Sequence, residues 1–118
     1  MGEERRRFSR VPCHLPVQLV LQGEPRVIQT LTKDLAEGGL RCLSPVPLPA
    51  LTPCAIGIVL GTKRSPIHLY GYTRWIEPVE NGSQFYIGLA FDRTSPWDTS
   101  QLSGYLNHLA GYAEVSSS

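Results

Sequence analysis

Cysteine is scarce in this sequence, and the few copies do not form a recognisable set. Cys13, Cys42 and Cys54 are odd in number and far apart, without a Cys-x-x-Cys pair. Neither a disulfide framework nor a zinc site is therefore indicated. The neighbouring residues Cys13 and His14 lack a second pair of ligands. We expect reduced, partly buried thiols and no bound metal or other cofactor.

Long hydrophobic runs are also lacking. No stretch approaches the roughly 20 apolar residues that a membrane span needs. The apolar residues that follow the basic N-terminus are interrupted by Pro12, His14 and Pro16, which argues against a signal peptide. The sequence therefore predicts a cytoplasmic protein without membrane insertion.

Charge is low and nearly balanced. Charged residues make up 18% of the chain, with 11 basic and 10 acidic side chains and a net charge of +1. Such a balance does not favour a surface that coats a polymeric nucleic acid. We also find no nucleophile–base pair, metal set or phosphate-cradling loop, so we do not expect an enzyme.

Glycine and proline, by contrast, are frequent, with 11 and 10 copies, and they favour short strands joined by turns. Alternating apolar residues predict the strands, and a turn at residues 22–25 makes the first two a hairpin. The proline-rich residues 44–53 are expected to form a rigid crossover loop. The expected strands cover residues 14–21, 26–35, 40–43, 55–60, 67–76 and 84–91. Six strands in so short a chain predict a small all-β fold, an antiparallel, split or Greek-key-like β-barrel.

The hydrophobic period changes near the C-terminus. Trp97, Leu102 and Leu106 approximate a helical spacing, and Ser95, followed by proline, is a suitable N-cap. We expect one C-terminal helix that ends near Gly111 and packs outside the barrel or across one end. The expected organisation is an arm (residues 1–11), the barrel with its helix (12–113) and a tail (114–118).

Arginine is concentrated at the start of the chain, in the stretch Arg5-Arg6-Arg7-Phe8-Ser9-Arg10. A guanidinium can hold a phosphate or a guanine edge through two parallel hydrogen bonds, and it can stack on a flat ring. One such cluster in a nearly neutral chain indicates a local anion site. The alternative is a solvated basic tail, which is common at termini.

A second constellation is Asp34-Leu35-Ala36-Glu37-Gly38-Gly39, where a strand ends in a carboxylate and a double-glycine turn. Asp34 offers an acceptor for the Watson–Crick donors of guanine, and Gly39 offers backbone that a flat ligand can approach. The alternative is a plain hairpin turn capped by Asp34.

Taken together, the two constellations resemble the motifs of the PilZ domain family. Arg6 and Arg10 stand in its Arg-x-x-x-Arg frame, and Asp34, Ala36 and Gly39 stand in its Asp-x-Ser-x-x-Gly turn. The stretches Gly71 to Trp75 and Gly88-Leu89-Ala90-Phe91 are similar to two further strands of the family. The resemblance covers roughly residues 4–110.

The resemblance implies a receptor for the bacterial second messenger cyclic di-GMP. Arg6 and Arg10 would bind guanine edges and phosphates, and Asp34 would accept hydrogen bonds from guanine. Gly39 would let the turn sit close to the ligand. Arg5, directly before the motif, favours binding of two stacked ligands. Ala36 replaces the family's serine and removes one hydroxyl contact, which is typically worth about 1 kcal/mol.

Three functions stay open. In the first, an arm over residues 3–11 becomes ordered on cyclic di-GMP, and an unidentified effector protein reads the changed surface. In the second, the domain is a degenerate PilZ-like adaptor that binds only protein. In the third, it is a small barrel that binds nucleic acid through the arginine arm.

Overall fold

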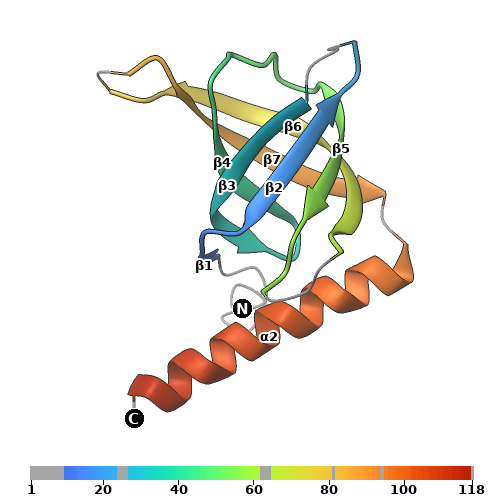
Figure 1. Cartoon of the computed structure of the whole chain (residues 1–118), viewed down its shortest axis with the longest axis vertical. Coiled ribbons are helices and arrows are strands. Elements are labelled where there is room, and N and C mark those ends of the chain that lie inside the picture. The colour runs from blue at the N-terminus through green and yellow to red at the C-terminus, as the bar shows by residue number, and fades with distance from the viewer. Residues whose placement is uncertain (1–9, 24–26, 62–64, 81, 94, 118) are drawn as a thin grey trace, which may run out of the picture.

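The residues described in the computed structural model form seven strands and one helix (Figure 1). The structure describes residues 10–23, 27–61, 65–80, 82–93 and 95–117; the side chains of Arg93 and of residues 110–117 are outside this description. The strands are β1 (Val11–Pro12), β2 (Pro16–Leu21), β3 (Val27–Ala36), β4 (Gly39–Ser44), β5 (Pro53–Ile58), β6 (Ile67–Pro78) and β7 (Phe85–Arg93). The helix is α2 (Pro96–Ser117).

The sheet closes on itself. Its strand order is β1-β3-β2-β5-β6-β7-β4, and an additional pairing of β3 with β4 joins the two ends. All pairings are antiparallel. The predicted six-stranded antiparallel barrel with one C-terminal helix is therefore confirmed, with β1 as an additional short strand that the sequence had not indicated.

The barrel interior is filled by the alternating apolar residues that predicted the strands. Leu15, just before β2, and Val17, Leu19 and Leu21 on β2 are all buried, whereas Gln18 between them is exposed. Similar alternation on the other strands brings Ile, Leu and Val side chains into one core. The crossover loop expected over residues 44–53 is confirmed over residues 45–52, which link β4 to β5. Its two ends differ from the expectation, because Ser44 pairs with Phe85 and Pro53 pairs with Tyr72 in the sheet.

Two glycines let neighbouring strands approach β7 closely enough to close the barrel. A Cβ built on Gly39 would lie 2.0 Å from the carbonyl oxygen of Leu89, and one on Gly71 would overlap the backbone of Ala90 in the same way. Gly71 also sits at a register shift between β6 and β7. A glycine in mid-strand often marks such an irregularity.

Helix α2 lies across one end of the barrel (Figure 1). The Ser95 hydroxyl accepts a hydrogen bond from the Asp98 backbone N–H at 3.1 Å, so the expected N-cap is confirmed. Asp98 Oδ1 in turn accepts from the His68 N–H at 3.1 Å, which ties the start of the helix to β6. Leu102 and Leu106 are buried beneath the helix.

Two expectations about the helix were wrong. Trp97 was expected on its buried face but is 65% exposed, because it lies in the first turn, where capping by Ser95 fixes the direction of the helix. The helix was also expected to end near Gly111, yet it continues to Ser117. One glycine costs only about 1 kcal/mol in a helix, and alanines on both sides of Gly111 favour continuation.

Candidate functional site

Asp34 owes its position to an irregularity in β3. Thr32 pairs with Cys42, but Asp34 pairs with Arg41, so β3 carries one extra residue at Lys33. Strict alternation along β3 predicts Asp34 on the same face as Thr32, which is fully buried. The bulge reverses this and turns Asp34 to the outer face that it shares with Arg41. Re-aiming a side chain in this way is a common consequence of bulges.

Two arginines hold the Asp34 carboxylate. Arg10 donates from Nη1 to Oδ1 at 2.8 Å, and Arg41 donates from Nε to Oδ2 at 2.6 Å. The Asp34 side chain is only 5% exposed, whereas both arginine side chains are 44% exposed. A nearly buried carboxylate is thus neutralised by two guanidiniums that face solvent, and the three groups together carry one positive charge.

The electrostatics follow from this geometry. The hydrogen bond that Arg41 donates to Asp34 raises the pKa of the Arg41 guanidinium, so Arg41 stays charged. Charged hydrogen bonds of this kind are stronger than neutral ones and fix the orientation of the carboxylate. The arrangement can therefore present a fixed acceptor, Asp34, beside an exposed, cationic donor, Arg10.

The contact between Arg10 and Asp34 joins the two constellations that the sequence singled out. They lie 24 residues apart in the chain. The strand β1 brings them together, because Val11 pairs with Leu35 and Pro12 pairs with Asp34. Arg5 and Arg6, the other expected arginines, lie outside the residues that the structure describes.

Ala36 and Gly39 end the two strands of the β3–β4 hairpin, where they pair with each other across a turn formed by Glu37 and Gly38. Ala36 is 6% exposed. Gly39 is required by its contact with the Leu89 backbone, whether or not a ligand approaches it.

Arg41 is the one residue of this cluster that the sequence reasoning missed. The strand register of the hairpin could have identified Arg41. A two-residue turn at Glu37 and Gly38 pairs Ala36 with Gly39, and counting two residues further in each direction brings Arg41 opposite Asp34.

The comparison with known families decides the classification. A model of the PilZ domain matches residues 4–108. The chain belongs to the PilZ domain family. The resemblance stated from the arginine frame and the aspartate–glycine turn is therefore confirmed.

Solved PilZ structures share the fold. The PilZ domain of YcgR from Escherichia coli, solved with c-di-GMP, matches with a TM-score of 0.73 at 21% identity, over 96% of this chain and 97% of that chain. The Bacillus subtilis inhibitor of motility, MotI (DgrA), matches with a TM-score of 0.71 at 19% identity over 86% of this chain. This chain covers 48% of MotI, or about half of its length.

A more distant match is PlzA of Borreliella burgdorferi, solved in complex with c-di-GMP. Its TM-score is 0.53 at 18% identity, over 89% of this chain and 37% of PlzA. At these identities the likeness establishes the fold of the PilZ domain and not its ligand. No curated protein sequence gives a significant match.

Two further findings concern this PilZ domain as far as the structure describes it. Within those residues, no group of three or more His, Cys, Asp or Glu side chains is placed to hold a metal ion. Over the same part of the chain, no helix is both long and apolar enough to cross a membrane.

Proposed function

We propose that this PilZ domain is a receptor for cyclic di-GMP. The observation that carries the proposal is the 2.8 Å contact between Arg10 and Asp34. It places the last arginine of the arm and the carboxylate of the turn at one point on the barrel surface. Two solved domains of the same fold, from YcgR and PlzA, contain c-di-GMP, which supports the same ligand class here.

Binding would exchange one partner of Asp34 for another. Arg10, which is 44% exposed, leaves Oδ1 and turns to a phosphate or to the N7/O6 edge of guanine, both of which suit a guanidinium. The freed oxygen then accepts from the Watson–Crick edge of guanine. Arg41 stays on Oδ2 and keeps the carboxylate oriented. Asp34 stays paired with the Arg41 cation after the exchange, and the positive charge of Arg10 becomes available to the doubly charged anion.

Arg5 and Arg6 complete the proposed site, although neither lies in the part of the chain that the structure describes. In the proposal, Arg6 binds the phosphates and guanine edges together with Arg10. Arg5 contacts a second, stacked ligand, so that two molecules bind per domain. Ala36 contributes a methyl group where a hydroxyl would donate, and Gly39 brings the turn close to the ligand.

Signalling follows from the position of the arginines on the arm. In the proposal, the bound ligand fixes residues 3–11 against the barrel, and an effector protein recognises the changed surface. Trypsin cleaves after arginine and therefore reports on Arg5, Arg6 and Arg7. We expect cyclic di-GMP to slow cleavage at these sites at least tenfold, and an unchanged cleavage rate under saturating ligand would contradict the ordering of the arm.

A protein-only adaptor is the second candidate. It is favoured by Ala36, which lacks the hydroxyl, and by Asp34, whose two oxygens both already have an arginine partner. In this alternative the ion pairs are a permanent structural cluster, and the protein partner binds without a nucleotide.

Calorimetric titration separates these functions. We expect saturable binding of cyclic di-GMP, with GTP and a short RNA giving no comparable signal, and a stoichiometry of two ligands per chain.

Arg6→Ala and Arg10→Ala should each weaken binding at least tenfold, or about 1.4 kcal/mol. Arg74→Ala, which removes an exposed arginine of β6 and changes the net charge equally, is the control. Binding of RNA but not of cyclic di-GMP would instead identify the nucleic-acid barrel.

A further inference from the structure

Twelve outward residues on and just beyond the paired segments of β2, β3, β5 and β6 include no Asp, Glu, Lys or Arg, and we refer to them as one face. Strand pairing aligns its outward residues in three rows that run across the four strands. The first row is Val27, Val20, Ala55 and Tyr70; the middle row is Gln29, Gln18, Gly57 and His68; the third is Leu31, Pro16, Val59 and Pro66. Antiparallel sheets that face water normally place polar and charged side chains outward. This face therefore does not have the composition of a simple solvent-exposed surface.

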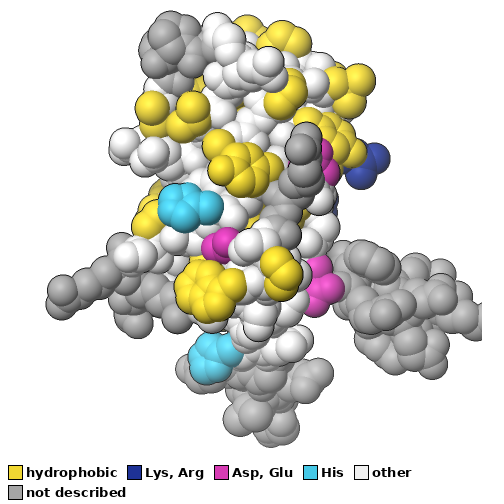
Figure 2. All heavy atoms as spheres, turned by 90° about the vertical axis from the view of Figure 1, so that its right-hand side faces the viewer, with side chains coloured by type: hydrophobic (Ala, Val, Ile, Leu, Met, Phe, Trp, Pro, Cys, Tyr) yellow, Lys and Arg dark blue, Asp and Glu magenta, His cyan; other side chains and the backbone are white. Residues whose placement is uncertain are grey.

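Exposed apolar side chains concentrate on the same face. In the part of the chain that the structure describes, six large hydrophobic residues are exposed, and four of them belong to these rows. They are Val20, Val27, Leu31 and Tyr70, with 43–55% of their surface open to solvent. Hydrophobic side chains are also prominent, and charged ones few, on the adjoining side of the barrel (Figure 2). Contiguous exposed apolar surface of this kind marks interaction sites.

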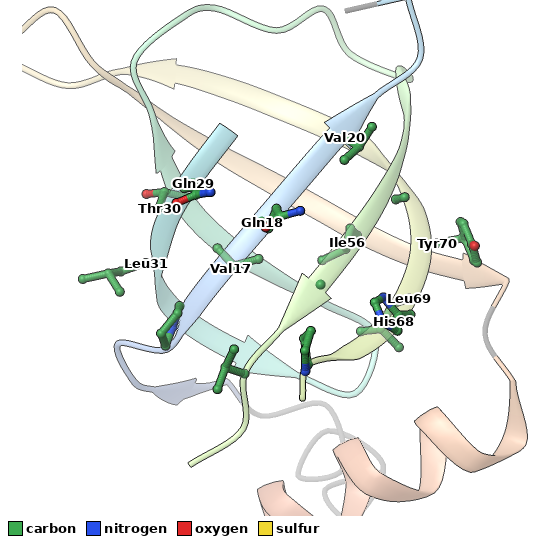
Figure 3. A pocket seen from close by; sticks show the side chains of 15 residues that line it. Val17, Gln18, Val20, Gln29, Thr30, Leu31, Ile56, His68, Leu69 and Tyr70 are labelled. Atoms are coloured by element: carbon green, nitrogen blue, oxygen red, sulfur yellow. The ribbon is translucent and has the colours of Figure 1, made fainter. Parts of the chain in front are cut away.

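The face is hollowed along its middle row. A groove of about 600 Å³ is bordered by Leu31 on one side and by His68 and Tyr70 on the other, and Gln18 projects from β2 between them (Figure 3). Gly57 leaves part of its floor without a side chain. A second hollow of about 620 Å³ continues it past Val20 and Tyr70, with Asp92 among its lining residues. Among the described residues that line the groove there is no Asp, Glu, Lys or Arg, and His68 is the one histidine.

We propose that this face is a self-association surface, on which a second copy of this chain packs about a two-fold axis. A two-fold interface brings a surface against itself, so the surface must complement itself. A charged patch would meet its own charge, whereas these rows contain no fixed charge to repel a symmetry mate. The net charge of +1 adds little repulsion between two copies.

The order of the three rows makes this face complementary to the same face of a second copy. A two-fold axis along the middle row sets the first row of one copy against the third row of the other, apolar on apolar. The same axis brings Gln18 opposite the partner's Gln18. Glutamine both donates and accepts, so two facing amides can satisfy each other. With twelve rather than the usual 20–30 residues on each side, the dimer should be weak, with a dissociation constant of about 10–500 μM.

This surface is independent of the proposed ligand site. Arg10, Asp34 and Arg41 are not among the residues of the three rows or of the groove. Self-association is therefore expected with or without cyclic di-GMP, and failure of either proposal leaves the other untouched.

Sedimentation velocity of the full chain from about 10 μM to about 1 mM tests the proposal. We expect a reversible monomer–dimer equilibrium for the wild type in this range. Gln18→Glu and Gln18→Lys each place like charges across the axis, and each should raise the dissociation constant at least tenfold. An equimolar mixture of the two variants should restore a dimer within about threefold of the wild-type affinity, because Glu then faces Lys. Gln84→Glu makes the same change at an exposed glutamine outside the face and should leave the equilibrium unchanged.

Three results would overturn the proposal. They are a wild type that stays monomeric at about 1 mM, a dimer that Gln18→Glu does not weaken, and a mixture of the two charge variants that stays monomeric. Circular dichroism of the variants excludes misfolding. Gly57→Leu is a second test, because its Cβ would make only ordinary contacts, with Pro66 at 3.8 Å and the Ile67 carbonyl oxygen at 4.0 Å, while the longer side chain enters the groove. It should change the dissociation constant at least threefold, and an unchanged value also contradicts the proposal.

Discussion

At the scale of single residues, Asp34 is the centre of the site. A carboxylate with 5% exposure is costly to bury unless it is paired, and Arg10 and Arg41 supply that pairing from two different parts of the chain. The surplus positive charge of the cluster suits an anionic ligand. The three side chains therefore serve both the stability of the hairpin and the proposed binding of cyclic di-GMP.

Removal of Arg41 tests whether its ion pair with Asp34 stabilises the fold. Arg41→Ala leaves Asp34 with Arg10 as its remaining partner, so we expect the free energy of unfolding to fall by about 1–2 kcal/mol. Arg41→Lys keeps the charge and should lose less than half of that. Urea unfolding measures both, with Arg74→Ala as the control. Equal stability of the wild type and Arg41→Ala would show that the ion pair contributes nothing.

Introducing a hydroxyl at position 36 tests whether the turn contacts cyclic di-GMP. Ala36→Ser supplies the donor that the family motif contains, and one neutral hydrogen bond of about 1 kcal/mol corresponds to roughly fivefold in affinity. Calorimetry should therefore show cyclic di-GMP binding several-fold more tightly to Ala36→Ser than to the wild type. Weaker or equal binding would mean that the turn does not contact the ligand as proposed.

At the scale of elements, the β3–β4 hairpin shows what the sequence could reveal and what it could not. Alternation and the double glycine predicted the strands and the turn, and the register of that turn could have revealed Arg41. The bulge at Lys33 could not be predicted, because nothing local distinguishes it. It arises from the pairing of β3 with β4, and it decides which way Asp34 points.

Thr32 fixes the segment between β1 and β2 against β3. Its buried hydroxyl accepts from the Leu15 N–H at 2.8 Å and donates to the Cys13 carbonyl at 2.8 Å. Both contacts hold β1, and with it Arg10, beside the hairpin. This clamp was not visible in the sequence, where Thr32 was one of several alternating strand residues.

Thr32→Val keeps the shape of the side chain but leaves those two backbone groups unpaired. We expect a loss of about 2 kcal/mol in the free energy of unfolding, since each buried unpaired group costs about 1–3 kcal/mol. Thr30→Val, two residues earlier on β3, should change stability by less than about 0.5 kcal/mol. Urea titration of both variants checks this. Similar losses of unfolding free energy in the two variants would show that the Thr32 hydroxyl has no special role.

At the scale of the whole molecule, the sequence predicted the barrel because its period-two pattern is carried by nearly every strand. What it could not provide were features that depend on distant neighbours. Gly39, for example, was interpreted as a place for ligand approach, but its immediate reason is the Leu89 backbone of β7. The exposure of Trp97 likewise depends on how α2 meets the end of the barrel.

The buried thiols give the whole fold a predictable response to alkaline pH. Burial raises the pKa of Cys42 to about 12 and that of Cys54 to about 11. In the unfolded chain the thiols ionise near pH 9, so between pH 9 and 11 the unfolded state loses protons that the folded state retains. Stability should therefore fall as pH rises through this window, by up to about 1.4 kcal/mol per pH unit for each thiol.

The double variant Cys42→Ala/Cys54→Ala isolates this contribution. It should be less stable at pH 7 because it loses packed volume, yet its stability should decline less steeply between pH 9 and 10 than that of the wild type. Urea unfolding at each pH gives the two slopes, and parallel slopes would show that the thiols ionise in the folded state as readily as in the unfolded chain.

The central claim is that the end of the arginine arm and the aspartate of the hairpin act on one ligand. It is tested most directly by calorimetric titration of cyclic di-GMP into wild-type protein, Arg10→Ala and Asp34→Ala under identical conditions. We expect saturable binding to the wild type and a loss of affinity of at least tenfold, about 1.4 kcal/mol, in each folded variant. Wild-type affinity in both variants would contradict it.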